Sequence, residues 1–346
     1  MLRKNKFFSP IIGLLLVIAL AFAIALGAVP ISLNEMFAAL QHFFTNQKPA
    51  NIHEAVFLQI RLPRVLLCAI SGAVLAVSGV LMQGLFRNPI VEPGLVGTSA
   101  GAAFGASIVF VLSANMNIRL KELTGPLLVP LFAFLGGLLA TYIVYALAKG
   151  TRKTSLLSLL LIGIAINAIG LSGTGFMSYI ARDPQARSIT FWNLGTFSGA
   201  SWMQVLIVSV VTTIIFTIAI RYSKQLNALL LGEEEANYLG VDTQKLNRNI
   251  MLLNTAMISV VTAFVGVISF MGLIVPHVLR LLIGSDNKKL LPASMIMGAL
   301  LLTLADMGAR LLLAPAEIPI GIITSLVGAP VFIILLKKFN LFSQKV

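Results

Sequence analysis

Long uncharged stretches alternate with short charged segments along the whole chain. Nine stretches can be marked, at 11–29, 65–86, 93–118, 123–148, 154–181, 188–220, 249–279, 290–305 and 318–336. A helix needs about 20 residues to cross a hydrocarbon core of about 30 Å, and only 290–305 needs flanking residues such as Ala309 to do so. The apolar residues do not alternate in segments of about ten, as they do in β-barrels. The pattern predicts an all-α polytopic membrane protein. Its first stretch is a retained span, with signal-peptide cleavage near Ala21–Ala25 as the alternative.

The positions of lysine and arginine predict how these helices cross. The loops 221–248 and 280–289 are both basic, and the positive-inside rule places both in the cytoplasm. The stretch between them must then cross twice, as a span over 249–270, a turn at 271–276 and a short returning helix at 277–284. This predicts ten transmembrane helices with both termini cytoplasmic. It assigns 17 basic residues to the inner side and 8 to the outer side.

Composition excludes a soluble protein. Of the 346 residues, 58% are hydrophobic and 11% are charged, against about 45–50% and about 25% in soluble domains. A net charge of +13 would suggest nucleic acid in a soluble protein, but here the basic residues lie between apolar stretches, where they set topology. Cys68 is the only cysteine, so no disulfide forms within the chain. We therefore expect one membrane-spanning domain over residues 1–346, without a nucleic-acid partner.

The largest cytoplasmic segment, at about 221–248, carries two short helical pieces with apolar and acidic faces. Gly232 and Gly240 punctuate them, and the three glutamates at 233–235 begin the second piece, where the helix dipole favours negative charge. A solvated loop helix is the simplest interpretation. In a chain with almost no other loops, a compact amphipathic pair also suits the docking of a cytoplasmic partner.

The sequence holds no motif for catalysis or ATP binding. G-x-x-x-x-G-K-[ST], H-E-x-x-H and C-x-x-C are all absent, so we expect neither catalytic nor metal-binding residues, and a structural role for His277. Asp306 is nearly the only carboxylate within a span, and it can pair with Arg310 at i+4. Because ion coupling needs such carboxylates, uphill transport would draw on a separate ATPase. An ion-coupled secondary transporter and a non-transporting scaffold are the alternatives.

The outer side carries five arginines that oppose the topology rule: Arg61, Arg64, Arg182, Arg187 and Arg310. A specific anionic partner explains them, and lipid headgroups are an equally good explanation for any single one. The stretch 190–202 combines aromatic residues with glycines, which fits either an interfacial aromatic belt or a short outer helix that gates a pathway. Gly97, Gly101 and Gly105 share one helix face and predict close packing within the subunit, with a contact between subunits or a smooth pore-facing wall as the alternatives.

Several motifs together resemble the iron-chelate and cobalamin permeases of ABC importers, the FecCD type. The matching pieces include Arg61-Leu-Pro-Arg64, Gln83-Gly-Leu-Phe-Arg-Asn-Pro89, Glu92-Pro-Gly-Leu-Val-Gly97, Phe191-Trp-Asn-Leu-Gly195, Phe270-Met-Gly-Leu-Ile-Val-Pro-His277 and Glu317-Ile-Pro-Ile-Gly321. They run from about residue 55 to residue 335. The resemblance implies a type II ABC importer permease of ten helices, which forms a homodimer with the pathway at its interface. Two cytoplasmic ABC ATPases and a periplasmic binding protein would be its partners.

The same resemblance implies roles for particular residues. Those that would couple to the ATPases are Leu229, Leu230, Gly232, Glu233, Glu234, Glu235, Leu239 and Gly240. Those that would meet glutamates of the binding protein are Arg61, Arg64 and Arg310. The cytoplasmic gate would consist of Asn88, Pro89 and Ile90. The pathway would be lined by Asn167, Arg182, Arg187, Phe191 and Trp192, with the stretch 188–198 as a short helix beside the outer cavity.

Heme is the substrate that the resemblance favours, on the residues 187–195 and the stretch that begins at Arg87. A ferric siderophore or cobalamin is the alternative. No cofactor would stay bound to the chain, because ATP and Mg²⁺ would be held by the partner ATPases. The implied location is the bacterial inner membrane, with the bilayer itself as a further partner.

Overall fold

The computed structural model describes residues 8–27, 29–45, 47–113, 127–149 and 156–343. Several basic residues used to predict the topology lie outside these ranges: Arg3, Lys4, Lys6, Arg119, Lys121, Arg152, Lys153 and Lys345. The side of the membrane on which each of them lies therefore stays a prediction. Among the described residues the elements are all helical, and none is a β-strand.

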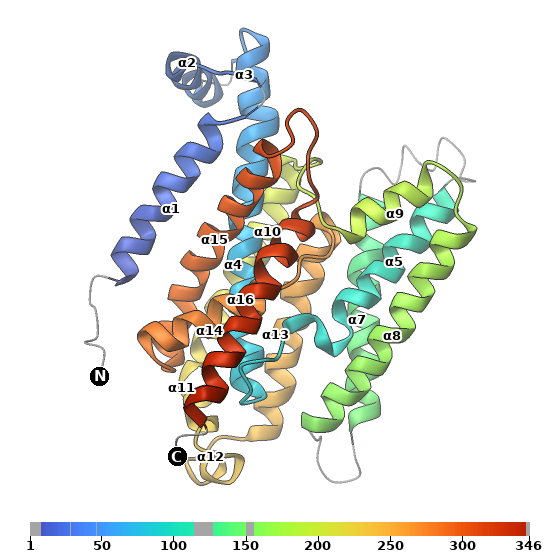
Figure 1. Ribbon diagram of the computed structural model, residues 1–346, viewed down its shortest axis with the longest axis vertical. Helices are drawn as coiled ribbons and strands as arrows, with labels where there is room; N and C mark the ends of the chain where they lie inside the picture. The colour runs from blue at the N-terminus through green and yellow to red at the C-terminus, as the bar shows by residue number, and fades with distance from the viewer. Residues whose placement is uncertain (1–7, 28, 46, 114–126, 150–155, 344–346) are drawn as a thin grey trace.

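Ten long apolar helices make up the described bundle (Figure 1). They are α1 (Phe8–Ala25), α4 (Leu62–Leu85), α5 (Thr98–Leu112), α7 (Leu128–Ala148), α8 (Leu156–Ile180), α10 (Trp202–Arg221), α13 (Thr243–Val265), α14 (Met271–Ile283), α15 (Asn287–Leu311) and α16 (Ile320–Ser343). Seven are long and apolar enough to cross a membrane by themselves, and α5, α14 and α16 are the further apolar helices. The predicted all-α polytopic fold is confirmed, and the ten helices fall where the sequence predicts spans.

Short helices lie at the two ends of this bundle. At one end are α2 (Leu33–Phe44), α3 (Ile52–Val56) and α9 (Gln185–Asn193), and at the other are α11 (Ser223–Leu229) and α12 (Glu233–Tyr238) (Figure 1). A π-helical turn at Phe57–Arg61 joins α3 to α4. Helix α16 ends on the α11–α12 side, and α1 runs from that side toward α2. We call the end with α2, α3 and α9 the outer end and the end with α11 and α12 the inner end.

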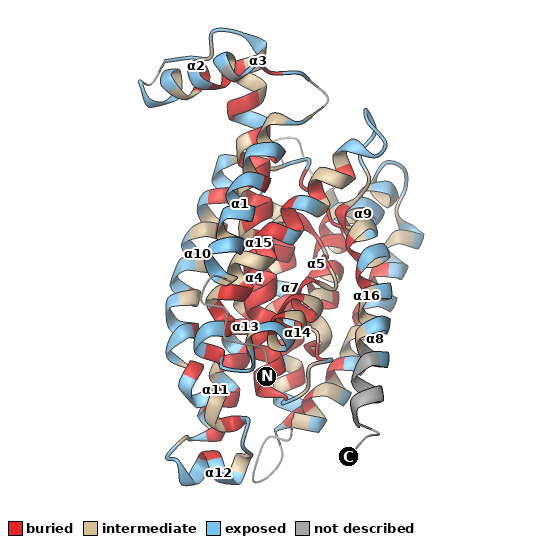
Figure 2. Cartoon of the chain, turned by 60° about the vertical axis from the view of Figure 1, so that its left-hand side comes forward, coloured by how far each residue is buried: buried red, intermediate tan, exposed pale blue. Residues whose placement is uncertain are grey.

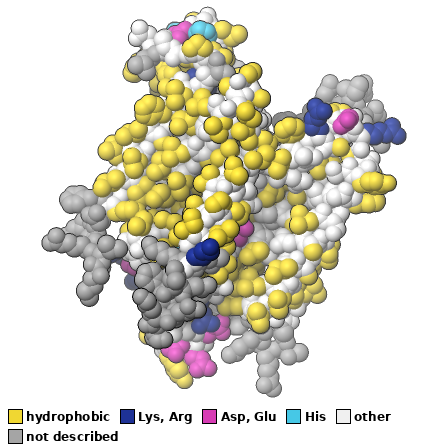
Figure 3. Space-filling view, in the orientation of Figure 1, with side chains coloured by type: hydrophobic (Ala, Val, Ile, Leu, Met, Phe, Trp, Pro, Cys, Tyr) yellow, Lys and Arg dark blue, Asp and Glu magenta, His cyan; other side chains and the backbone are white. Residues whose placement is uncertain are grey.

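Helix α4 is the centre of the bundle. An apolar stretch of 18 residues in the helical run Ile52–Leu85, which includes α4, is 89% buried. The corresponding stretch of α1 is 17% buried, and Figure 2 shows this contrast. Hydrophobic side chains cover most of the face in Figure 3, as expected for a surface that meets lipid. Glycines allow α4 to approach its neighbours closely, because a β-carbon on Gly72 would overlap the Gly298 backbone and one on Gly79 would overlap Gly272.

The expected glycine packing on α5 is confirmed for two of its three glycines. A β-carbon on Gly101 would overlap the Gly136 carbonyl oxygen, and one on Gly105 would overlap the Phe132 carbonyl oxygen, both on α7. Gly97 plays a different part. It precedes α5 with φ 89°, a left-handed conformation that glycine adopts without a steric penalty.

The break between α13 and α14 lies earlier than predicted. The chain leaves α13 at Gly266 (φ 76°) and α14 begins at Met271, so the expected turn at 271–276 is wrong and Pro276 lies inside a helix. A proline cannot donate to the carbonyl four residues before it, here that of Gly272. The side-chain amide of Gln83 lies 3.4 Å from that oxygen and donates to the Leu273 carbonyl at 3.0 Å. This polar contact from α4 accommodates the proline within the bundle.

The outer helices α2 and α3 are held by a network of carboxylates and histidines. Ser32 and Glu35 form a capping box at the start of α2, and Glu35 Oε1 lies 2.7 Å from His53 Nδ1. The pKa of Glu35 is lowered from 4.5 to about 2. The main cause is the hydrogen bond from the Ser32 backbone N–H, and the hydrogen bond with His53 is the second cause. Phe43 at the end of α2 stacks on Trp202, with ring centroids 5.8 Å apart.

Acid is therefore expected to loosen α2. A carboxyl with a depressed pKa stabilises the folded state fully above its unfolded value, here 4.5, and loses that contribution as pH falls toward about 2. We expect a fluorescence change of Trp202 over this interval in a Trp192→Phe background, where Trp202 is the only tryptophan. In Glu35→Gln this step should disappear. An unchanged step in that variant would contradict the assignment.

Candidate functional site

A cavity of about 660 Å³ opens among α5, α8, α9 and the α13–α14 connection. Leucine, isoleucine and alanine side chains supply much of its wall. Its polar wall residues include Glu92, Ser99, Asn167, Thr174, Ser178, Thr190, Asn193 and Thr262. Among the described residues that line it there is one carboxylate and no lysine or arginine. Pockets of this volume hold organic ligands of drug size.

The segment after α4 forms the floor of this cavity. The chain turns back into the bundle there as a short helix at Pro93–Val96. Three polar side chains hold this segment. Asn254 donates to the Pro93 carbonyl at 3.2 Å, Asn167 donates to the Leu95 carbonyl at 3.0 Å, and a Glu92 oxygen accepts the Phe270 N–H at 3.0 Å.

The structure places one of the five predicted lining residues, Asn167, on this cavity. Helix α9 turns Ile189, Thr190 and Asn193 toward the cavity instead. Trp192 is buried against alanines of α5, α7 and α13, and Phe191 lines a smaller pocket beside Arg64. Arg182 and Arg187 are exposed near the start of α9. Sequence reasoning missed Thr190 and Asn193, whose spacing on a helix could have indicated them.

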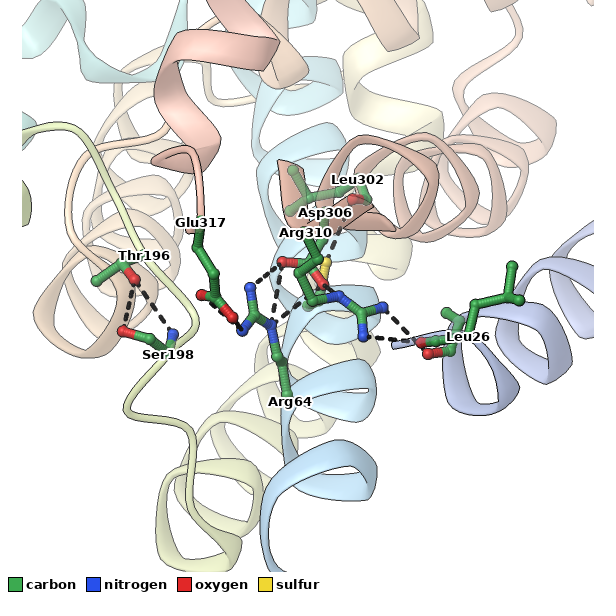
Figure 4. Close-up of polar contacts among 10 residues, drawn as sticks. Leu26, Arg64, Thr196, Ser198, Leu302, Asp306, Arg310 and Glu317 are labelled. Atoms are coloured by element: carbon green, nitrogen blue, oxygen red, sulfur yellow. Dashed lines mark hydrogen bonds and ion pairs between the residues drawn. The ribbon is translucent and has the colours of Figure 1, made fainter. Parts of the chain in front are cut away.

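Two arginines and two carboxylates form a cluster near the outer end, which we call the outer cluster: the buried Arg64, Asp306 and Arg310, and the exposed Glu317 (Figure 4). Arg64 Nη2 lies 3.0 Å from Asp306 Oδ1, and its Nη1 donates to both Glu317 oxygens at 2.7 and 2.9 Å. Arg310 Nε lies 3.0 Å from Asp306 Oδ2, which confirms the predicted i,i+4 pair. The cluster joins α4, α15 and the loop before α16.

The predicted docking arginines are not free on the surface. Arg61 is 5% exposed and donates to the carbonyls of Ile24, Ala25 and Val29, where α1 ends and leaves carbonyl groups without helical partners. The side chains of Arg64 and Arg310 are each 8% exposed. Internal carbonyls and carboxylates thus contact the guanidinium groups, and the docking role of these arginines stays a prediction.

The predicted coupling segment forms a compact projection at the inner end. Leu226, Leu229 and Ala236 are fully buried and attach it to the bundle, so Leu229 is an anchor rather than a contact residue. Asn227 donates to Asp286 at 2.8 Å, and this bond lowers the pKa of Asp286, which caps the start of α15.

The exposed face of this projection is both apolar and acidic. Leu239 is 64% exposed, and Leu230, Glu234 and Glu235 are also exposed, while Glu233 is half-buried. Gly232 (φ 140°) and Gly240 (φ 81°) bracket α12. Two further residues were missed by the sequence reasoning, namely Leu231 and Tyr238, which is 90% exposed.

Two of the three predicted gate residues meet at the inner end of α4. Asn88 and Pro89 line a pocket of about 270 Å³ with Leu230 and with His277 and Arg280 of α14. Ile90 does not line this pocket and is 46% exposed. The predicted gate and the predicted coupling segment therefore adjoin, which the sequence could not reveal because the two segments are about 140 residues apart.

A ten-helix membrane bundle with a cavity between its helices and an exposed inner projection defines a membrane-embedded transport subunit. The model of the FecCD transport family matches residues 15–338, and the chain belongs to this family. It is a multi-pass permease subunit of an ABC importer, in which ATP is hydrolysed by a separate subunit.

Similar proteins carry different cargoes. The hemin transport system permease protein HmuU of Yersinia pestis is 39% identical over 333 residues, which cover 94% of this chain and 95% of HmuU. The vitamin B12 import permease BtuC of Vibrio parahaemolyticus is 36% identical over 93% of each chain, and the molybdate import permease MolB of Haemophilus influenzae is 34% identical over 94% of each. A solved metal-chelate type ABC transporter in an inward-facing conformation superposes with a TM-score of 0.82, at 32% identity over 95% of this chain and 98% of that chain.

Proposed function

We propose that this permease imports heme, delivered by a periplasmic binding protein, across the bacterial inner membrane. The observation that carries the proposal is the cavity of about 660 Å³, whose wall is mainly apolar with neutral polar groups and no cation among its described residues. Such a wall suits a large apolar chelate better than a small inorganic oxyanion, which needs cationic or N–H donors. The 39% identity to a hemin permease agrees with it.

The assembly proposed for this function has three kinds of protein component. Two copies of the chain would enclose the pathway, and two ABC ATPases holding ATP and Mg²⁺ would dock on the α11–α12 projection. The binding protein would dock at the outer end, near the outer cluster. This orientation places both termini in the cytoplasm. The gate would lie at Asn88 and Pro89, next to that projection.

Uptake by cells tests the substrate directly. We expect a strain without this gene to lose uptake of labelled hemin and to regain it from a plasmid copy, while uptake of a ferric siderophore and of cobalamin stays normal. If the strain lost siderophore or cobalamin uptake and kept hemin uptake, the proposed assembly would still hold, but the proposed substrate would be wrong.

A further inference from the structure

The pocket of about 270 Å³ at the inner end gathers basic side chains. It lies where the end of α4, the helix α14 and the turn between α11 and α12 meet. Three basic side chains line it: Arg87, His277 and Arg280. No aspartate or glutamate is among the described residues that line it. The pocket therefore fits an anionic oxygen group, which guanidinium groups bind by charge-assisted hydrogen bonds.

Arg280 is the strongest indication of a missing ligand. Its Nε and Nη2 atoms are buried and have no hydrogen-bond partner among the described residues. Buried polar groups in proteins are nearly always hydrogen-bonded, and a buried charge without a partner is unfavourable. An anion that accepts from these nitrogens would remove this penalty. By contrast, Arg61 and Arg64 at the outer end donate to internal acceptors, and Arg310 Nε, which also makes no hydrogen bond to a described residue, lies 3.0 Å from the Asp306 carboxylate.

The local backbone places the three basic groups together. His277 and Arg280 are three residues apart on α14 and so share one face of that helix. Gln83, which also lines the pocket, binds the first turn of α14 and fixes that helix against α4. Arg87 follows α4 with φ 51°, a left-handed conformation that is uncommon for a residue with a side chain.

The rim of the pocket is apolar. Leu281, which follows Arg280 on α14, is 51% exposed, and Leu230 of the α11–α12 turn is 38% exposed. We propose that the pocket binds the anionic head of an amphiphile, a phosphate or carboxylate group, with Arg280 as its main ligand. An inner-leaflet phospholipid can supply the phosphate. Hemin passing the gate can supply carboxylates, and this second source rests on the proposed function.

Lipid retention tests the first source. Full-length permease in detergent would be exposed to phosphatidylglycerol and to phosphatidylcholine, and bound lipid would be counted by native mass spectrometry. We expect the wild type to retain phosphatidylglycerol preferentially and Arg280→Gln to bind it about tenfold more weakly. Arg280→Lys should keep part of the preference. Arg221→Gln, which removes an exposed arginine at the inner end of α10, is the matched control and should leave it unchanged.

Hemin binding tests the second source. The permease in lipid-free detergent would be titrated with hemin, and binding would be followed by the visible absorbance of hemin. A loss in Arg280→Gln confined to phosphatidylglycerol assigns the pocket to lipid, and a loss confined to hemin assigns it to cargo. If neither probe depends on Arg280 in a variant that elutes as a folded monodisperse species, the proposal is overturned. The lipid measurement involves neither transport nor heme, so failure of the proposed function would leave it standing.

Discussion

Asp306→Ala is expected to destabilise the permease by about 3–5 kcal/mol, the range for removing one partner of a buried ion pair. Asp306 is 2% exposed, accepts hydrogen bonds from Arg64 and forms an ion pair with Arg310. Without it, the partners left among the described residues are backbone carbonyls at the end of α1 for Arg310, and Glu317 for Arg64. An uncompensated buried charge would remain between α4 and α15, near the outer end of the bundle.

The thermal midpoint of the detergent-solubilised permease measures this effect. Glu317→Gln is the matched control, because it removes a carboxylate of the same cluster whose side chain is 42% exposed, and we expect it to cost about 1 kcal/mol or less. The double variant Asp306→Asn with Arg310→Gln restores charge balance and should recover much of the loss. Equal destabilisation by Asp306→Ala and Glu317→Gln would contradict the argument from burial.

The second large effect is expected from reversing the charge on α12, which should act on association with the ABC ATPase. Replacing Glu233, Glu234 and Glu235 with lysine is expected to abolish association with the ABC ATPase while membrane insertion persists. The anchors of the projection, Leu226 and Leu229, are fully buried and are not altered by this change. The exposed acidic face would become basic and would repel whatever positive surface the ATPase offers to it.

Co-purification of the ATPase with tagged permease from membranes measures this association. Asp242→Asn is the control, because Asp242 is an exposed carboxylate in the same segment that caps α13 and pairs with Lys245. It should leave co-purification unchanged. Normal recovery of ATPase with the triple variant would remove the α12 face from the proposed interface.

Helix number and position could be predicted because they follow from hydrophobic length and from the sidedness of lysine and arginine. Each predicted span corresponds to a helix of the bundle. The exact break between α13 and α14 could not be predicted in the same way. Pro276 signals a helix end in most contexts, and its tolerance here depends on Gln83, nearly 200 residues away in sequence.

Side-chain direction was the harder problem. The sequence shows that Arg61 and Arg64 lie near the outer end, but only the fold shows that α1 carbonyls and the carboxylates of the outer cluster occupy them. Likewise, the sequence predicts the aromatic residues of α9 as pathway residues, whereas the helix turns Thr190 and Asn193 to the cavity. Long-range pairing decides both cases, and a single sequence does not contain that information.

ATP-driven uptake of hemin by proteoliposomes tests the central claim most directly. The liposomes would contain this permease with its ABC ATPase, with binding protein and hemin outside and ATP inside. The account predicts accumulation of hemin that requires ATP hydrolysis and persists when ionophores collapse all ion gradients. Uptake that proceeds without the ATPase and stops with the ionophores would contradict it and would indicate an ion-coupled transporter.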